Sequence, residues 1–199
     1  MVFFQGPEDY GVPPKNVTGD MEEQSGRLLE REFFGPSCEP SSKREKPPHL
    51  HFGAALHEAI RKVEGAGVWN TQKPNTDLAL LLYEQVLRGL KSVGLMGVIR
   101  RLKLYPAIGT SLDMWHGTDG VLVAEGLFQS WYVLFDVSLR HKSKRRRNPS
   151  KANHLLIRFK DLDDSLAVIL KSSRKIVRMF QDLIGHPLKP RKRRVVTGH

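Results

Sequence analysis

The sequence is short of cysteine and of long apolar runs. Cys38 is the only cysteine among 199 residues, which excludes an internal disulfide and a cysteine-based zinc site and favours a reducing compartment. No apolar run approaches the roughly 20 residues that span a membrane, and the first residues lack the basic start and apolar stretch of a secretory signal. We expect an intracellular protein without a membrane partner, cytoplasmic in a bacterium or nuclear in a eukaryote.

Acidic residues are missing from two stretches in which basic residues concentrate. The basic residues are Arg140, Lys142, Lys144, Arg145, Arg146, Arg147 and Lys151 in the first stretch, and Lys189, Arg191, Lys192, Arg193 and Arg194 in the second. These charges exceed the net charge of +11, so the remainder of the chain is close to neutral. Such concentration favours a polyanionic partner, DNA rather than RNA. Solvated basic segments or nuclear-import signals would have the same composition.

Proline and charge divide the chain into three regions. Residues 1–50 hold seven prolines and are expected to be flexible or partner-binding, serving a homodimer or a partner subunit. Residues 51–188 are expected to form one α/β domain, and residues 189–199 a basic tail. Apolar periodicity and capping signals predict helices over 54–64, 77–93 and 163–184, and strands within 115–141 and over 154–160; residues 95–105 fit a short helix or a first strand. The pattern predicts a central mixed sheet flanked by helices.

Residues 115–141 predict two strands joined by a short turn, and each strand carries an aspartate. If the turn centres between residues 127 and 128, Asp119 faces Asp136 with Cβ atoms about 4.5–5.5 Å apart. Facing carboxylates repel, so the pair needs a divalent cation, a shared proton or a basic neighbour. A divalent metal is our first interpretation, with Asp113 as a third nearby carboxylate. A zinc site of Asp119 with His116 and His141 is an alternative.

The order of these residues resembles the PD-(D/E)XK nuclease superfamily. The resemblance covers about residues 76–184 and depends on Glu84 in a helix, on GTDGVLV around Asp119 and on YVLFDVSLRHK around Asp136. It implies a restriction-endonuclease-like core in which Mg²⁺ or Mn²⁺ is held by Asp119, Asp136 and the carbonyl of Val137. It also implies that Glu84 supports the metal site, although an ordinary surface pair with Arg88 explains Glu84 as well.

The same resemblance implies a magnesium-dependent endonuclease that hydrolyses DNA phosphodiester bonds. The catalytic lysine of the family corresponds to Ser138 here, and Lys142 lies four residues further on, at the same strand parity, where it could substitute. The expected contacts to the nucleic-acid backbone are Arg140, Lys144, Arg145, Arg146 and Arg147 in the basic loop and Lys171, Arg174, Lys175 and Arg178 on the last helix. The alternative is a non-catalytic nucleic-acid-binding or scaffold protein with a degenerate nuclease-like fold.

Overall fold

A computed structural model describes residues 28–35, 47–138, 153–159 and 165–185. Its elements are α2 (Phe52–Ala66), α3 (Asp77–Ser92), the short 3₁₀ helix η2 (Leu95–Gly97), β1 (Arg101–Pro106), α4 (Ser111–His116), β2 (Gly120–Glu125), β3 (Ser130–Ser138), β4 (His154–Arg158) and α5 (Ser165–Gly185). A further helical stretch covers residues 28–34. The expected mixed α/β fold with a central mixed sheet is confirmed.

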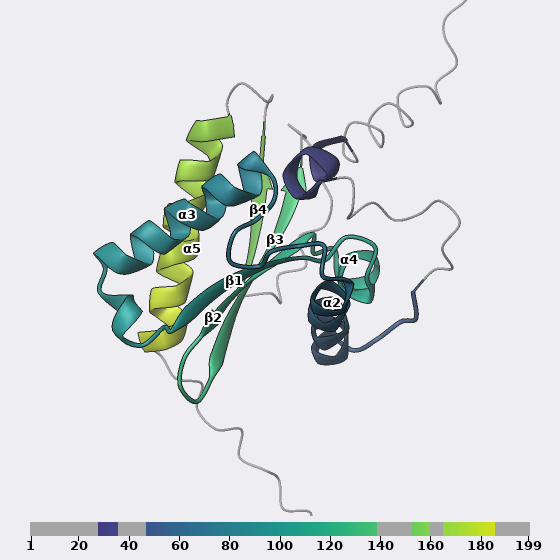
Figure 1. The fold of residues 1–199 in the computed structure, drawn as a ribbon, viewed down its shortest axis with the longest axis horizontal. Coiled ribbons are helices and arrows are strands. Elements are labelled where there is room, and N and C mark those ends of the chain that lie inside the picture. Colours follow the sequence, from purple (N-terminus) through teal and green to yellow (C-terminus); the bar gives the residue numbers. More distant parts are fainter. Residues whose placement is uncertain (1–27, 36–46, 139–152, 160–164, 186–199) are drawn as a thin grey trace, which may run out of the picture.

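The four strands form one sheet in the order β1-β2-β3-β4. The first three are antiparallel neighbours, whereas β4 runs parallel to β3. Helices α3 and α5 lie side by side on one face of the sheet, and α2 and α4 lie on the other (Figure 1). The sheet is therefore the middle layer of three.

The alternation of β3 divides its side chains between two cores. Val133, Phe135 and Val137 belong to the larger core under α3 and α5, whereas Leu134 belongs to the smaller core under α2 and α4. This is the alternation that the sequence predicts, because successive side chains of a strand point to opposite faces. Asp136 consequently lies on the α2/α4 face.

The helical stretch 28–34 is part of the larger core. Leu29, Phe33 and Phe34 are buried there, and the ring of Phe34 stacks on that of Phe135 with centroids 6.0 Å apart. Residues 28–34 therefore pack into the domain, while residues 1–27 and 36–46 lie outside the described residues. The three large apolar side chains of residues 28–34 are buried in the domain core, as the hydrophobic effect favours.

The chain enters β2 through a helix that the sequence analysis did not expect. Trp115 and His116, expected to begin a strand, lie in α4. This helix forms because the Thr110 hydroxyl accepts hydrogen bonds from the backbone N–H groups of Leu112 and Asp113, which caps its first turn. Residues 95–105 contain both structures that the sequence left open, since η2 is followed by β1.

Other sequence expectations lie outside the described residues. They concern the basic loop with Arg140, Lys142, Lys144, Arg145, Arg146 and Arg147, and the basic tail 189–199. In the part of the chain that the structure describes, no helix combines the length and the apolar character needed to cross a membrane.

Candidate metal centre at the Asp119–Asp136 pair

Asp119 and Asp136 face each other across β2 and β3. Gly120 pairs with Phe135 in the antiparallel register, so the next pair outward is Asp119 with Asp136. The backbone N–H of Asp119 also donates to the carbonyl of Phe135 at 3.0 Å, although β2 itself begins one residue later. The register on which the predicted carboxylate pair depends is therefore confirmed.

The Asp119 side chain is buried at the end of the sheet, where it accepts a backbone hydrogen bond. It is 4% exposed, and its Oδ2 accepts a hydrogen bond from the backbone N–H of Val137 at 2.7 Å. Its own carbonyl accepts from the N–H of Ala107 at 2.8 Å. Because β2 begins only at Gly120, no β2 residue pairs with Val137, and the carboxyl group supplies the acceptor that this buried N–H requires.

The surroundings of Asp119 favour its protonated form. Burial, a hydrogen bond with Asp136 and the charge of Asp136 raise the pKa of Asp119 far above the ordinary aspartate value, and the N–H of Val137 only partly offsets this. Two carboxylates at hydrogen-bonding distance cannot both ionise readily. Asp119 is therefore protonated near neutral pH in the metal-free protein, the second of the three arrangements that the sequence allows.

Gly120 leaves room for an aromatic ring on the face of the sheet opposite to the pair. A Cβ atom at Gly120 would lie 2.3 Å from the ring of Phe135, its partner in the register. No side chain fits there unless the ring moves. The glycine of the TDG sequence thus lets the Phe135 ring lie across β2 on the α3/α5 face.

Two further acids surround the pair. Asp113 in α4 is held by its Oδ2, which accepts from the N–H of Gly109 at 2.8 Å; burial raises its pKa, and the nearby charges of Asp136 and Lys62 act in opposite directions. Glu30, from the helical stretch 28–34, raises the pKa of Asp119 through its charge. The sequence analysis missed Glu30 because proline content assigned residues 1–50 to a tail, although apolar and acidic residues alternate around it.

The structure does not bring Glu84 to this pair. Glu84 is exposed on α3, and α3 packs on the face of the sheet opposite to Asp136. The apolar side chains of the same helix face the larger core, which leaves Glu84 toward solvent. The structure thus places Glu84 across the sheet from the pair, and a supporting role of Glu84 at a metal site stays a prediction.

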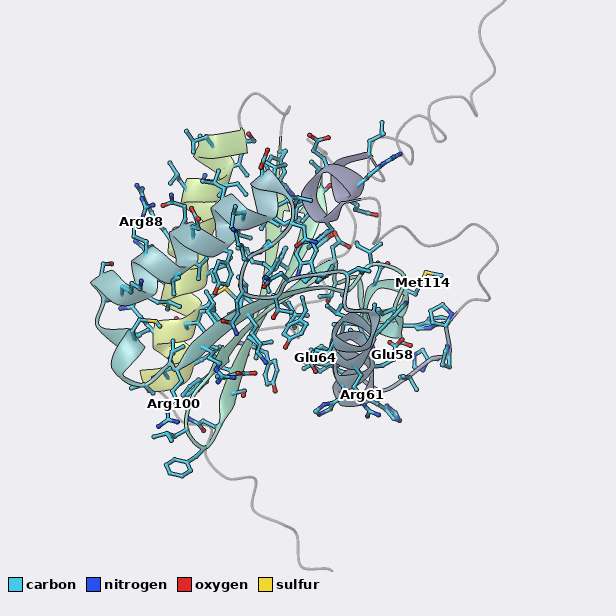
Figure 2. The ribbon with its side chains drawn as sticks, in the orientation of Figure 1. Glu58, Arg61, Glu64, Arg88, Arg100 and Met114 are labelled. Atoms are coloured by element: carbon cyan, nitrogen blue, oxygen red, sulfur yellow. The ribbon has the colours of Figure 1, made fainter. Side chains whose placement is uncertain are left out.

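The four basic residues of α5 are all exposed: Lys171, Arg174, Lys175 and Arg178. Their helix covers the same face as α3, so they lie across the sheet from the carboxylate pair. Figure 2 shows the side chains around both layers, with Glu58, Arg61 and Glu64 on α2 and Arg88 on α3. A nucleic acid that contacts both the carboxylate pair and the basic residues of α5 would have to pass around an edge of the sheet.

Four candidate residues remain, and the structure describes two of them. Val137 contributes its N–H to Asp119, while the metal-binding role of its carbonyl stays a prediction. A ring nitrogen of His116 lies 3.0 Å from the carbonyl oxygen of Leu50, so this histidine already has a backbone partner. Lys142 and His141 lie outside the described residues, and so the substitute lysine and the zinc alternative both stay predictions.

The donor atoms of the pair fit a hard divalent cation. Mg²⁺ prefers carboxylate oxygens and keeps several waters, so two carboxylates suffice once the shared proton leaves. Among the residues that the structure describes, no group of three or more histidine, cysteine, aspartate or glutamate side chains is placed to hold a metal. The fit depends on Asp119 and Asp136 alone.

Comparison of the chain with family models, with curated proteins and with solved structures finds no match.

Proposed function

We propose that this protein is a divalent-metal-dependent endonuclease that hydrolyses DNA phosphodiester bonds at the Asp119–Asp136 pair. The observation that supports the proposal is the pair itself, two carboxyl groups on adjacent strands that share a proton in the absence of a cation. A buried acid kept protonated by a second acid is a feature of functional sites more often than of ordinary cores. The resemblance of the sequence to PD-(D/E)XK nucleases supplies the reaction.

In this proposal both residues of the pair would hold the metal. The Val137 N–H fixes the Asp119 carboxyl group, and this group with that of half-buried Asp136 would hold Mg²⁺ or Mn²⁺. When bound, the metal would lower the pKa of a water molecule and offset negative charge on the phosphate. Ser138 cannot supply a positive charge, so that part belongs to an arginine or lysine of the basic loop, with Lys142 as our candidate.

The test is cleavage of labelled single- and double-stranded DNA and RNA with Mg²⁺, Mn²⁺ or EDTA. We expect metal-dependent cleavage of DNA by the wild type, and its loss in Asp136→Ala, because one ligand cannot retain the ion beside the phosphate. Glu84→Ala is the matched control: it removes an acid on the far face and should leave cleavage unchanged. Cleavage that persists in EDTA, or in Asp136→Ala, would contradict the proposal.

A second function is favoured by one observation. Asp119 accepts the buried N–H of Val137, which alone could explain an acid at this position without any metal. The protein would then bind nucleic acid or act as a scaffold without cutting. DNA binding that is independent of metal and equal in the wild type and Asp136→Ala, with no cleavage in either, would establish this alternative.

A further inference from the structure

The hairpin between β2 and β3 carries two exposed apolar side chains at its tip. Phe128 is 95% exposed and Leu127 is 62% exposed. Hairpin tips are ordinarily built from Gly, Asn or Asp, which suit turn conformations and water. Leucine and phenylalanine at these positions add almost nothing to the core, so they are better explained by contact with a partner than by folding.

The tip is a fixed platform. The N–H of Gly126 donates to the carbonyl of Gln129 at 2.9 Å, which closes the turn. A Cβ atom at Gly126 would lie 2.9 Å from the ring of Trp131, so the turn rests directly on this ring, which is itself buried. The ring of Phe128 is thus presented outward from a supported turn.

Two arginines flank the tip. The N–H of Arg100 donates to the carbonyl of Glu125 at 2.7 Å, and Arg101 pairs with Glu125 in the strand register. Both arginine side chains are exposed, and Figure 2 shows Arg100 close to the hairpin. The carboxylate of Glu125 pairs with Lys103 at 2.8 Å, so the acid beside the arginines is neutralised and the tip offers positive charge around an apolar centre.

We propose that this tip binds an unpaired stretch of a nucleic-acid strand, with Phe128 stacked on a base and Arg100 and Arg101 on the flanking phosphates. One exposed ring is enough for stacking on any base, and guanidinium groups bind phosphate oxygens in a bidentate manner. A lipid surface fits less well. Even a whole myristoyl chain anchors a protein only marginally, and two side chains insert far less hydrocarbon.

The partner class rests on the proposed function, but the two sites are separate. Asp119 precedes β2 and the tip lies beyond its other end, so the six residues of that strand put the sites at least about 20 Å apart. That separation corresponds to about six nucleotides along a duplex strand. The tip would therefore hold a single-stranded arm while the carboxylate pair meets the backbone some nucleotides away.

The experiment measures binding of the full chain to a forked DNA duplex whose single-stranded arm carries 2-aminopurine. EDTA is present throughout, so cleavage has no influence. We expect Phe128→Ala to weaken binding at least fivefold, as removal of one stacked ring does, and to abolish the change in 2-aminopurine emission. Phe128→Trp keeps a ring and should bind like the wild type. Phe52→Ala, which removes an exposed phenylalanine of α2, is the matched control.

Three results would overturn the proposal. The first is equal DNA binding by Phe128→Ala and the wild type. The second is full DNA binding by Phe128→Leu, which keeps an apolar group without a ring. The third is that Phe128→Ala weakens binding to phosphatidylserine vesicles but leaves DNA binding unchanged. The endonuclease proposal is tested separately. Metal-dependent cleavage with normal binding by Phe128→Ala overturns only the role of the tip, whereas weakened binding without any cleavage overturns only the endonuclease.

Discussion

At the scale of single residues, the proton on Asp119 makes stability depend on pH. Its folded pKa lies above the unfolded value of about 4, so the folded state binds the extra proton between those two values. The stability that this proton confers is complete below pH 4 and is lost as pH rises toward the folded pKa, with a slope of up to about 1.4 kcal/mol per pH unit.

Asp119→Asn should remove this slope. The amide oxygen can accept from the N–H of Val137 and the amide nitrogen can donate to Asp136, so the variant imitates the protonated acid without titrating. We expect urea midpoints of the wild type to fall between pH 5 and pH 8 and those of the variant to fall less, which leaves the variant the more stable protein at pH 8. Parallel curves for the two proteins would show that Asp119 carries no shared proton.

Gly120 gives a prediction about packing. Gly120→Ala would place a methyl group against the ring of Phe135, and overpacking of this kind costs about 1–3 kcal/mol. The expected result is a lower urea midpoint at unchanged pH dependence. Gly97→Ala, where a Cβ atom meets nothing within 4 Å, is the control and should change the midpoint much less.

Sequence reasoning predicted the pair on the condition that the turn centres between residues 127 and 128. Asp119 and Asp136 are equidistant from that point, so they face each other. Sequence reasoning did not predict the raised pKa of Asp119, since the burial of this side chain is set by the tertiary fold. The position of Glu84 was not predictable for a related reason: periodicity shows which side of a helix is apolar, but not which face of the sheet that side covers. The face is set by the tertiary fold.

At the scale of elements, the basic side of α5 gives a prediction about how DNA binding depends on salt concentration. If it touches the DNA backbone, Lys171→Gln with Lys175→Gln should remove about two phosphate contacts and lower the slope of log K against log salt by about 1.8. Arg61→Gln with Lys73→Gln removes two exposed charges that lie outside α5 and serves as the control. If the two double variants have equal slopes of log K against log salt, the basic residues of α5 make no specific contact with the DNA backbone.

The stretch 28–34 gives another prediction at this scale. Phe34 is 1% exposed and stacks on Phe135, so Phe34→Ala should cost about 3–5 kcal/mol. Leu28→Ala, at a position 62% exposed, should cost little. Thermal or urea unfolding of the two variants checks this, and similar midpoints would show that the stretch does not contribute to the core.

At the scale of the whole molecule, the four strands follow one another in the sheet in chain order, and helices from both ends of the described chain cover them. The layers were predictable in outline, because alternating strands and amphipathic helices leave few ways to bury both faces of a sheet. The order of the strands was not, since the parallel partner of β3 follows a basic segment with no periodic pattern.

The ring of Phe33 lies 6.5 Å from that of Phe159, almost at the other end of the described chain, and 5.9 Å from that of Phe135. A chain emerging from the ribosome therefore makes the stretch 28–34 long before its partners exist. Contacts between such distant segments slow folding, because the long intervening loop must close first. The hairpin that carries Asp119 and Asp136 is local, but the charge of Glu30 acts on Asp119 only once the stretch 28–34 has packed into the larger core.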